Sequence, residues 1–174
     1  MTKKRSARYR KNVIPLKNYE INAPIASAAL AIGSGGKTTF SFGANIVAMV
    51  NGQLADALSA ADAPALTAAE ASDGTTPTTL AIDYERAYTL LVTMNATTGV
   101  LTASLAVSAD FAEGHIWKQS DFNFGNSVDN DSHKAVVGVV IIANTTNVFT
   151  PGMTALDAAG VTVRYLNNVA PLYA

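Results

Sequence analysis

Several short stretches of this 174-residue chain alternate between hydrophobic and polar side chains. Phe40 and Phe42 are separated by Ser41, and residues 161–166 repeat the alternation near the C-terminus. Because a period of two places successive side chains on opposite faces of a strand, both stretches predict half-buried β-strands. The stretch 134–143 is almost continuously apolar and β-branched, which predicts a strand that is buried on both faces.

Turn signals divide the N-terminal half into further strands. The glycine-rich segment 33–36 separates residues 21–32 from residues 38–50, which predicts a hairpin because glycine tolerates positive φ. An Asn-Gly pair at 51–52 predicts a second tight turn, from which the chain returns along residues 53–58.

Two longer segments lack a strand pattern. Residues 59–79 predict a long loop, and residues 109–133 predict an irregular loop that contains the single tryptophan, Trp117. Strand patterns at 88–94 and 100–107 lie between them. We therefore expect an all-β protein whose body is a β-sandwich or is jelly-roll-like.

The N-terminal segment differs from the rest in pattern and in charge. Residues 1–20 have no apolar periodicity and Pro15 opposes a continuous helix, so we expect an extended basic arm there, followed by a β-rich body over residues 21–174. Seven of the twelve Lys and Arg residues lie within the first seventeen positions, whereas residues 18–174 carry five basic and thirteen acidic residues, a formal charge of −8. The candidate docking residues of the arm are Lys3, Lys4, Arg5, Arg8, Tyr9, Arg10 and Lys11.

Three interpretations of this arm stay open. It is a disordered solubilising tail, a polybasic segment that neutralises nucleic-acid phosphates, or an arm that becomes ordered when it docks on an acidic neighbouring subunit. The acidic body argues against nucleic acid, since a dedicated nucleic-acid binder normally carries a basic folded face as well.

Composition narrows the class of protein. Charged residues make up 14% of the chain, against roughly 25% in ordinary soluble domains, which leaves uncharged surface for burial against partners. Much of the hydrophobic content is alanine, which buries little area, and oligomerisation commonly compensates for a core of small side chains. The chain has no cysteine, which excludes disulfides and thiolate metal sites. The apolar run 135–143 is shorter than the roughly 20 residues that a membrane helix needs, and the basic start is not followed by an apolar signal, so neither a membrane span nor export is expected.

Residues 31–38 come close to a phosphate-binding loop but fit a hairpin turn better. Ala31 stands where the motif has glycine, and residues 39–42 alternate like a strand where the motif opens a helix. We therefore expect a turn here rather than a nucleotide site.

Metal patterns are incomplete in the same way. Asp129, Asp131 and His133 are spaced as calcium ligands often are. However, Lys134 and Val140 stand where an EF-hand has its glycine and its closing glutamate, so a solvated turn is expected.

No catalytic constellation is evident either. His115 and His133 lie in polar loop sequence without a Gly-x-Ser-x-Gly elbow, so both are expected at the surface. Asp83 and Glu85 share one strand face, which predicts a solvated face rather than a glycosidase pair. We expect no enzymatic activity, no cofactor and no metal site.

The C-terminal part of the chain carries a family resemblance. Residues 134–140 run Lys-Ala-Val-Val-Gly-Val-Val, and residues 149–165 run Phe-Thr-Pro-Gly-Met-Thr-Ala-Leu-Asp-Ala-Ala-Gly-Val-Thr-Val-Arg-Tyr. With the earlier Phe-x-Phe strand, Asn-Gly turn and mid-chain glycines in the same order, the chain resembles small virion structural proteins of tailed bacteriophages over most of residues 38–167. Met153 departs from the threonine that this pattern has after Pro-Gly. The earlier matching positions are Phe40, Phe42, Asn51, Gly52, Gly99 and Gly138.

The resemblance implies a capsid decoration (cement) protein on the surface of the virion. Such a protein would form a homotrimer, bind between major capsid protein subunits of the assembled shell and stabilise it, with the basic arm docking on neighbouring subunits. A phage fibre or receptor-binding module is the alternative, in which the loop 109–133 would contact a host-surface glycan or protein. At the C-terminal end, Thr154 is expected to cap a short helical turn that Gly160 ends in the left-handed region.

Overall fold

The computed structural model describes residues 23–24, 29–33, 38–42, 45–50, 53–55, 57–59, 64–71, 73–95, 97–122 and 134–167. Within these ranges the regular structure is β, apart from two short 3-10 helices, η3 (Leu66–Ala68) and η4 (Gln119–Asp121). The all-β fold class is therefore confirmed. The finer description, a sandwich or jelly roll with an extended arm, stays a prediction, because the arm lies outside the described residues.

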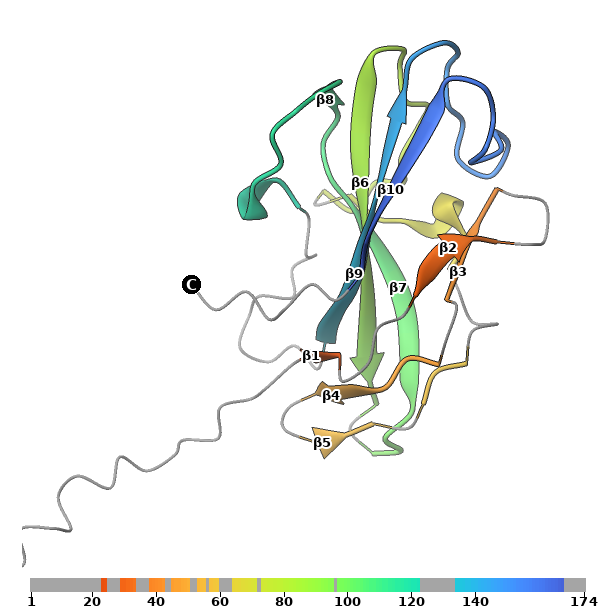
Figure 1. Ribbon diagram of the computed structural model, residues 1–174. Coiled ribbons are helices and arrows are strands. Elements are labelled where there is room, and N and C mark those ends of the chain that lie inside the picture. The colour runs from red at the N-terminus through yellow and green to blue at the C-terminus, as the bar shows by residue number, and fades with distance from the viewer. Residues whose placement is uncertain are drawn as a thin grey trace, which may run out of the picture.

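A long antiparallel sheet forms the centre of the protein (Figure 1). In the order β10-β9-β6-β7, its strands are β10 (Val161–Asn167), β9 (Lys134–Asn144), β6 (Tyr84–Met94) and β7 (Leu101–Val107), and the short β8 (Phe111–Ala112) pairs with the start of β6. These strands coincide with the predicted ones, although β6 begins four residues earlier than the pattern indicated. The apolar stretch predicted to be buried on both faces is β9, at the centre of the sheet beside β6.

Two small sheets come from the N-terminal part of the chain. One contains β1 (Ala23–Pro24), β4 (Ala48–Val50) and β5 (Gln53–Leu54), and the other is a hairpin of β2 (Leu30–Ile32) and β3 (Phe40–Phe42). Both predicted hairpins are confirmed by the antiparallel pairing of β2 with β3 and of β4 with β5.

The phosphate-loop alternative is resolved by the same hairpin. The backbone N–H of Gly33 donates to the carbonyl oxygen of Thr39 at 2.7 Å, and Ile32 pairs with Phe40, so the chain continues into a strand and not into a helix.

The prediction that residues 21–32 and 38–50 each form one continuous strand is wrong. Their described parts divide into β1 and β2, and into β3 and β4, which belong to different sheets. The division follows from packing: the hairpin β2–β3 lies against β10, whereas β1 and β4 lie against β9. Because the strands divide in this way, the two small sheets contact different strands of the long sheet, β10 and β9.

One face of the main sheet packs against these small sheets. Alternate residues of β6, among them Tyr88, Leu90 and Val92, are fully buried there. Each such side chain stabilises the fold by about 1.5–3 kcal/mol relative to exposure. Gly138 allows the close approach, because a Cβ atom there would lie 2.7 Å from the Leu30 Cδ1 atom of β2. We call this the core face. The other large side chains of the cluster that packs on it are Leu30, Phe40, Ile46, Leu66, Leu80, Ile142, Phe149 and Leu156.

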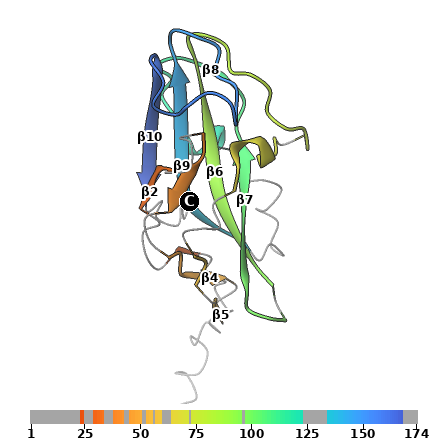
Figure 2. The ribbon, with the colours of Figure 1, turned by 90° about the vertical axis from the view of Figure 1, so that its right-hand side faces the viewer.

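The opposite face carries Glu85, Ala87 and Thr89 of β6, all buried. It is covered in part by the loop that follows β8, which lies on the other side of the sheet from β2 and β3 in Figure 1. Figure 2 shows the four long strands from a direction at right angles to that view. We call this the second face.

The turn before β10 differs from its prediction. Residues 155–159 form turns rather than a helix, and the Thr154 hydroxyl oxygen accepts a hydrogen bond from the Thr150 backbone N–H at 2.9 Å, so it does not cap the following residues. Gly160 is left-handed as expected, with φ of 80°.

Candidate functional site

The residues that the sequence nominated for docking lie outside the described part of the chain. These are Lys3, Lys4, Arg5, Arg8, Tyr9, Arg10 and Lys11. The candidate calcium ligands Asp129, Asp131 and His133 also lie outside it.

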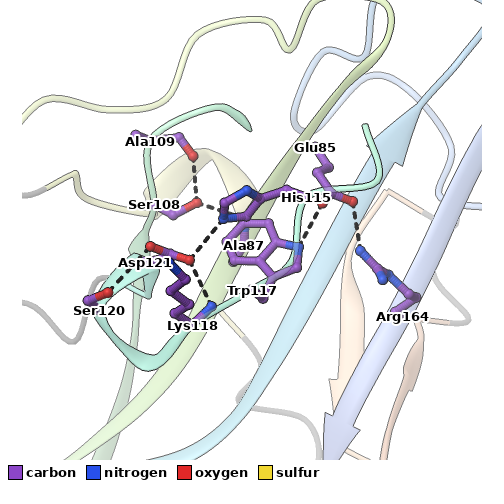
Figure 3. Close-up of polar contacts among 10 residues, drawn as sticks. All are labelled: Glu85, Ala87, Ser108, Ala109, His115, Trp117, Lys118, Ser120, Asp121 and Arg164. Atoms are coloured by element: carbon purple, nitrogen blue, oxygen red, sulfur yellow. Dashed lines mark hydrogen bonds and ion pairs between the residues drawn. The ribbon is translucent and has the colours of Figure 1, made fainter. Parts of the chain in front are cut away.

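The most unusual polar group in the described residues is Glu85, which is only 1% exposed on the second face. One carboxylate oxygen accepts a hydrogen bond from the Trp117 indole N–H at 2.8 Å, and the other accepts one from the Arg164 guanidinium at 2.7 Å (Figure 3). A buried carboxylate is costly unless it is paired and hydrogen-bonded, and both of its oxygens are satisfied here. Strand β6 supplies the carboxylate, β10 the guanidinium, and the loop that follows β8 supplies the indole.

This geometry overturns one prediction. Asp83 and Glu85 were expected to share a solvated strand face, but Glu85 is buried and Asp83 lies just before β6 in the left-handed region, with φ of 64°. The prediction failed because it treated the second face as open to water. The folded-back loop covers it.

Four rings build that cover: Phe111, His115, Trp117 and Phe122, which we call the aromatic cap. Trp117 stacks on Phe122 at a centroid distance of 5.3 Å and meets Phe111 edge-on at 5.1 Å, and Phe111 stacks on His115 at 4.1 Å. Offset-stacked and edge-on aromatic pairs contribute about 0.5–1.5 kcal/mol beyond their buried area. Trp117 and Phe122 pack on small aliphatic side chains of the second face, namely Ala87, Val139 and Ile141.

A carboxylate closes the loop of the aromatic cap. Asp121 Oδ2 lies 2.9 Å from His115 Nε2 and accepts a hydrogen bond from the Lys118 backbone N–H at 2.7 Å. The Lys118 N–H and then the His115 side chain lower the pKa of Asp121 below its ordinary value. His115 was expected at the surface, and it is instead half-buried within the cap.

The core face has an ion pair of its own near the start of β6. The Arg86 guanidinium, almost fully buried, bonds both carboxylate oxygens of Asp110 at 2.5 and 2.9 Å and donates to the Thr78 carbonyl at 2.8 Å. Burial disfavours the charged form of Arg86, but the interactions with Asp110 and Tyr88 together outweigh that cost and hold its pKa above the ordinary value. The pair fixes residues 78 and 110 against β6.

The Ser108 hydroxyl, beside the aromatic cap, is already engaged. The Ser108 hydroxyl donates to the Ala109 carbonyl at 2.7 Å and accepts from the Ala87 N–H at 2.9 Å. In Figure 3 the polar partner of His115 is therefore Asp121, and His115 does not accept a hydrogen bond from the Ser108 hydroxyl. These hydrogen bonds of Ser108, His115 and Asp121 hold the loop of the aromatic cap in position against the sheet.

The described residues contain neither a cluster of metal-ligating side chains nor a membrane-spanning helix. No group of three or more His, Cys, Asp or Glu side chains is placed there to hold a metal ion. No helix in the same ranges has the length and apolar character needed to cross a membrane.

Comparison with known proteins finds no match among protein-family models, curated proteins or solved structures.

Sequence reasoning missed the site on the second face. Glu85 and Arg164 are 79 positions apart, and Glu85 and Trp117 are 32 apart, so no local pattern links them. The available signal was the density of aromatic residues around the only tryptophan, in a loop beside apolar strands. It indicated burial of that loop rather than exposure.

Proposed function

We propose that the chain is a capsid decoration (cement) protein of a tailed bacteriophage, which binds between major capsid protein subunits on the outside of the assembled shell. The proposal is supported by the sequence resemblance and by the separation of charge along the chain. The first seventeen residues carry seven of the twelve basic side chains, and the remainder has a formal charge of −8. Opposite charges on one small protein favour docking of one copy on the next, or on a lattice.

The site on the second face supports a binding role for the protein, because its main side chains hold the fold together and leave contact with partners to the remaining surface. Glu85, Trp117 and Arg164 bond to one another on the second face, and the rings of the aromatic cap pack against the sheet. A body organised in this way supplies a rigid strand scaffold, and the arm supplies the attachment. A protein that binds the assembled shell and not the free subunits stabilises the shell by mass action, about 4 kcal/mol per site at a thousandfold excess over Kd.

The alternative, a fibre or receptor-binding module, places the contact with a host glycan in the loop of Trp117. Sugar recognition by tryptophan uses an accessible ring face and often the indole N–H. Here Phe122 stacks on Trp117, and Glu85 accepts the indole N–H. This favours the decoration role over the fibre role.

Co-sedimentation with empty shells tests the proposal. The full-length protein should pellet with shells made of the major capsid protein and should remain in solution without them. A variant with its six arm cations replaced by glutamine should bind at least about tenfold more weakly, since exposed charge pairs contribute roughly 0.2–1 kcal/mol each. The replaced residues are Lys3, Lys4, Arg5, Arg8, Arg10 and Lys11.

Two outcomes would contradict the proposal. One is a wild-type protein that fails to pellet with any phage shell but pellets with host cells, which is the result expected of a receptor-binding module. The other is an arm variant that binds shells as tightly as the wild type, which would remove the arm from the mechanism.

A further inference from the structure

At one end of the main sheet, where β6 begins and β9 ends, apolar side chains and carboxylates are exposed together. Ile82, Tyr84 and Val148 are 43%, 43% and 49% exposed, so three apolar side chains face solvent within one small area. Asp83 and Glu113 are exposed beside them. We call these five residues the end patch.

Backbone hydrogen bonds hold the segments of the end patch together. The Asp83 N–H donates to the Asn144 carbonyl at 2.7 Å, and the Glu113 N–H donates to the Asp83 carbonyl at 2.8 Å. Val148 precedes Phe149, which exchanges two backbone hydrogen bonds with Leu80. The patch is thus a fixed surface, built where the turns at 82–83, 113–114 and 145–148 meet.

The carboxylates of the end patch differ from their neighbours in their partners. Glu85 and Asp110, at most three residues from Asp83 or Glu113 along the chain, form ion pairs with Arg164 and Arg86. Among the residues that the structure describes, Asp83 and Glu113 form no ion pair. Two solvated negative charges next to three exposed apolar side chains fit a ligand that is both cationic and aromatic.

We propose that the end patch is the docking site for the basic arm, residues 3–11, of a second copy of this chain. The arm offers six cations and Tyr9, whose ring can lie against Tyr84 and Ile82 while the cations meet Asp83 and Glu113. This inference rests on the proposed function, because it makes a neighbouring copy of the decoration protein on the shell the subunit to which the arm attaches.

Geometry favours a second copy over the same copy. The arm leads into β1, at the opposite end of the sheet from the end patch (Figure 1). The eleven residues of β6 span about 35 Å, and the thirteen Cα-to-Cα steps from Lys11 to the second residue of β1 reach at most about 43–47 Å when fully extended. Docking of Lys11 within one copy would stretch that segment to most of its full length, at a cost in conformational entropy. A neighbouring copy imposes no such constraint.

Cross-linking the full-length protein in the absence of shells tests the inference. Equal amounts of unlabelled and ¹⁵N-labelled protein are mixed at low salt and treated with a carbodiimide, which joins lysine amines directly to carboxylates. We expect mixed-isotope peptides that link Lys3, Lys4 or Lys11 to Asp83 or Glu113. Linkage only within one copy, or only to carboxylates elsewhere on the body, would overturn the inference.

Sedimentation velocity supplies the matched variant test. The double variant Asp83→Asn and Glu113→Gln should self-associate about fivefold more weakly than the wild type at low salt, whereas the control Asp73→Asn should not differ. Asparagine tolerates the left-handed backbone at position 83, and Glu113→Gln alone serves as the test if the double variant misfolds. Unchanged self-association of a folded variant would overturn the inference.

The shell assay keeps this failure distinct from that of the proposed function. Wild-type protein that binds shells but shows neither self-association nor the cross-links contradicts only the arm-to-copy docking. Wild-type protein that shows the cross-links but never binds a shell contradicts only the decoration role.

Discussion

The two faces of the main sheet are stabilised by different physics, although the same strands supply both. On the core face, β6 contributes Tyr88, Leu90 and Val92 to a cluster that is apolar and closely packed. On the second face, the same strand contributes Glu85 to a hydrogen-bonded ion pair beneath the aromatic cap. Area burial is non-directional, whereas the carboxylate bonds depend on distance and angle.

The difference teaches where this fold tolerates change. The core face should lose stability in proportion to the volume removed, wherever the substitution lies. The second face should lose it only when a specific partner is lost, because three separate segments meet at a single carboxylate. Substitutions on the two faces can therefore separate packing from polar specificity within one strand.

The largest effect is expected on the core face. Leu90→Ala removes a fully buried side chain and leaves a cavity, so the free energy of unfolding should fall by about 3 kcal/mol. Urea denaturation followed by circular dichroism measures the change. Exposed Leu54, mutated to alanine, is the control and should cost less than about 0.5 kcal/mol. Equal losses at the two positions would contradict the assignment of the core face.

A smaller loss is expected when the buried carboxylate of the second face is removed. Glu85→Ala leaves the Trp117 N–H without its acceptor, and the free energy of unfolding should fall by about 2 kcal/mol. The full cost of breaking a buried pair is not expected, because Arg164 is 49% exposed and regains solvent. Glu113→Ala, at an exposed carboxylate nearby, is the matched control and should change stability by less than about 0.5 kcal/mol. If Glu85→Ala left the free energy of unfolding unchanged, the ion pair of Glu85 with Arg164 would contribute only enough to offset the cost of burying its charges.

The indole N–H should contribute less than the whole carboxylate. Trp117→Phe keeps an aromatic ring in the cap but removes the donor to Glu85, and about 1 kcal/mol of unfolding free energy should be lost. A double-mutant cycle with Glu85→Ala isolates the hydrogen bond, because Trp117→Phe should cost less once the acceptor is gone. Strictly additive losses would mean that Trp117 acts through packing alone.

The strands were predictable because their cause is local. Alternation placed Phe40 and Phe42 in a hairpin, and the apolar stretch 134–143 became the central strand β9. Turn residues indicated the hairpin boundaries, since glycine and Asn-Gly pairs readily adopt the positive φ values that tight turns need. These features depend on residues a few positions apart.

The site on the second face was not predictable for the opposite reason. Periodicity places Glu85 on the face opposite to Tyr88, but it does not reveal that a loop folds back to cover that face. The partners Arg164 and Trp117 come from distant segments, so their convergence depends on the register of the whole sheet. The docking residues of the arm stay a prediction from charge alone.

The smallest effect is expected at the edge of the aromatic cap, and it depends on pH. The Lys118 backbone N–H and the His115 side chain lower the pKa of Asp121 in the folded protein, so the folded state favours the carboxylate form. Its contribution is fully present above the unfolded value of about 3.9 and is lost as the pH falls through the lower folded pKa. Because Trp117 is the only tryptophan, its fluorescence should report a loosening of the cap below about pH 4.

A matched pair of variants identifies the group responsible. Asp121→Asn removes the titrating carboxyl, so this step in the Trp117 emission should disappear. Asp73→Asn removes a carboxyl whose pKa is also lowered, by the side-chain and backbone hydrogen bonds of Thr75, but which lies outside the cap, so the step should persist. If the step survives in Asp121→Asn, the acid sensitivity belongs to a group other than Asp121, and the bonds that close the loop of the aromatic cap do not set it.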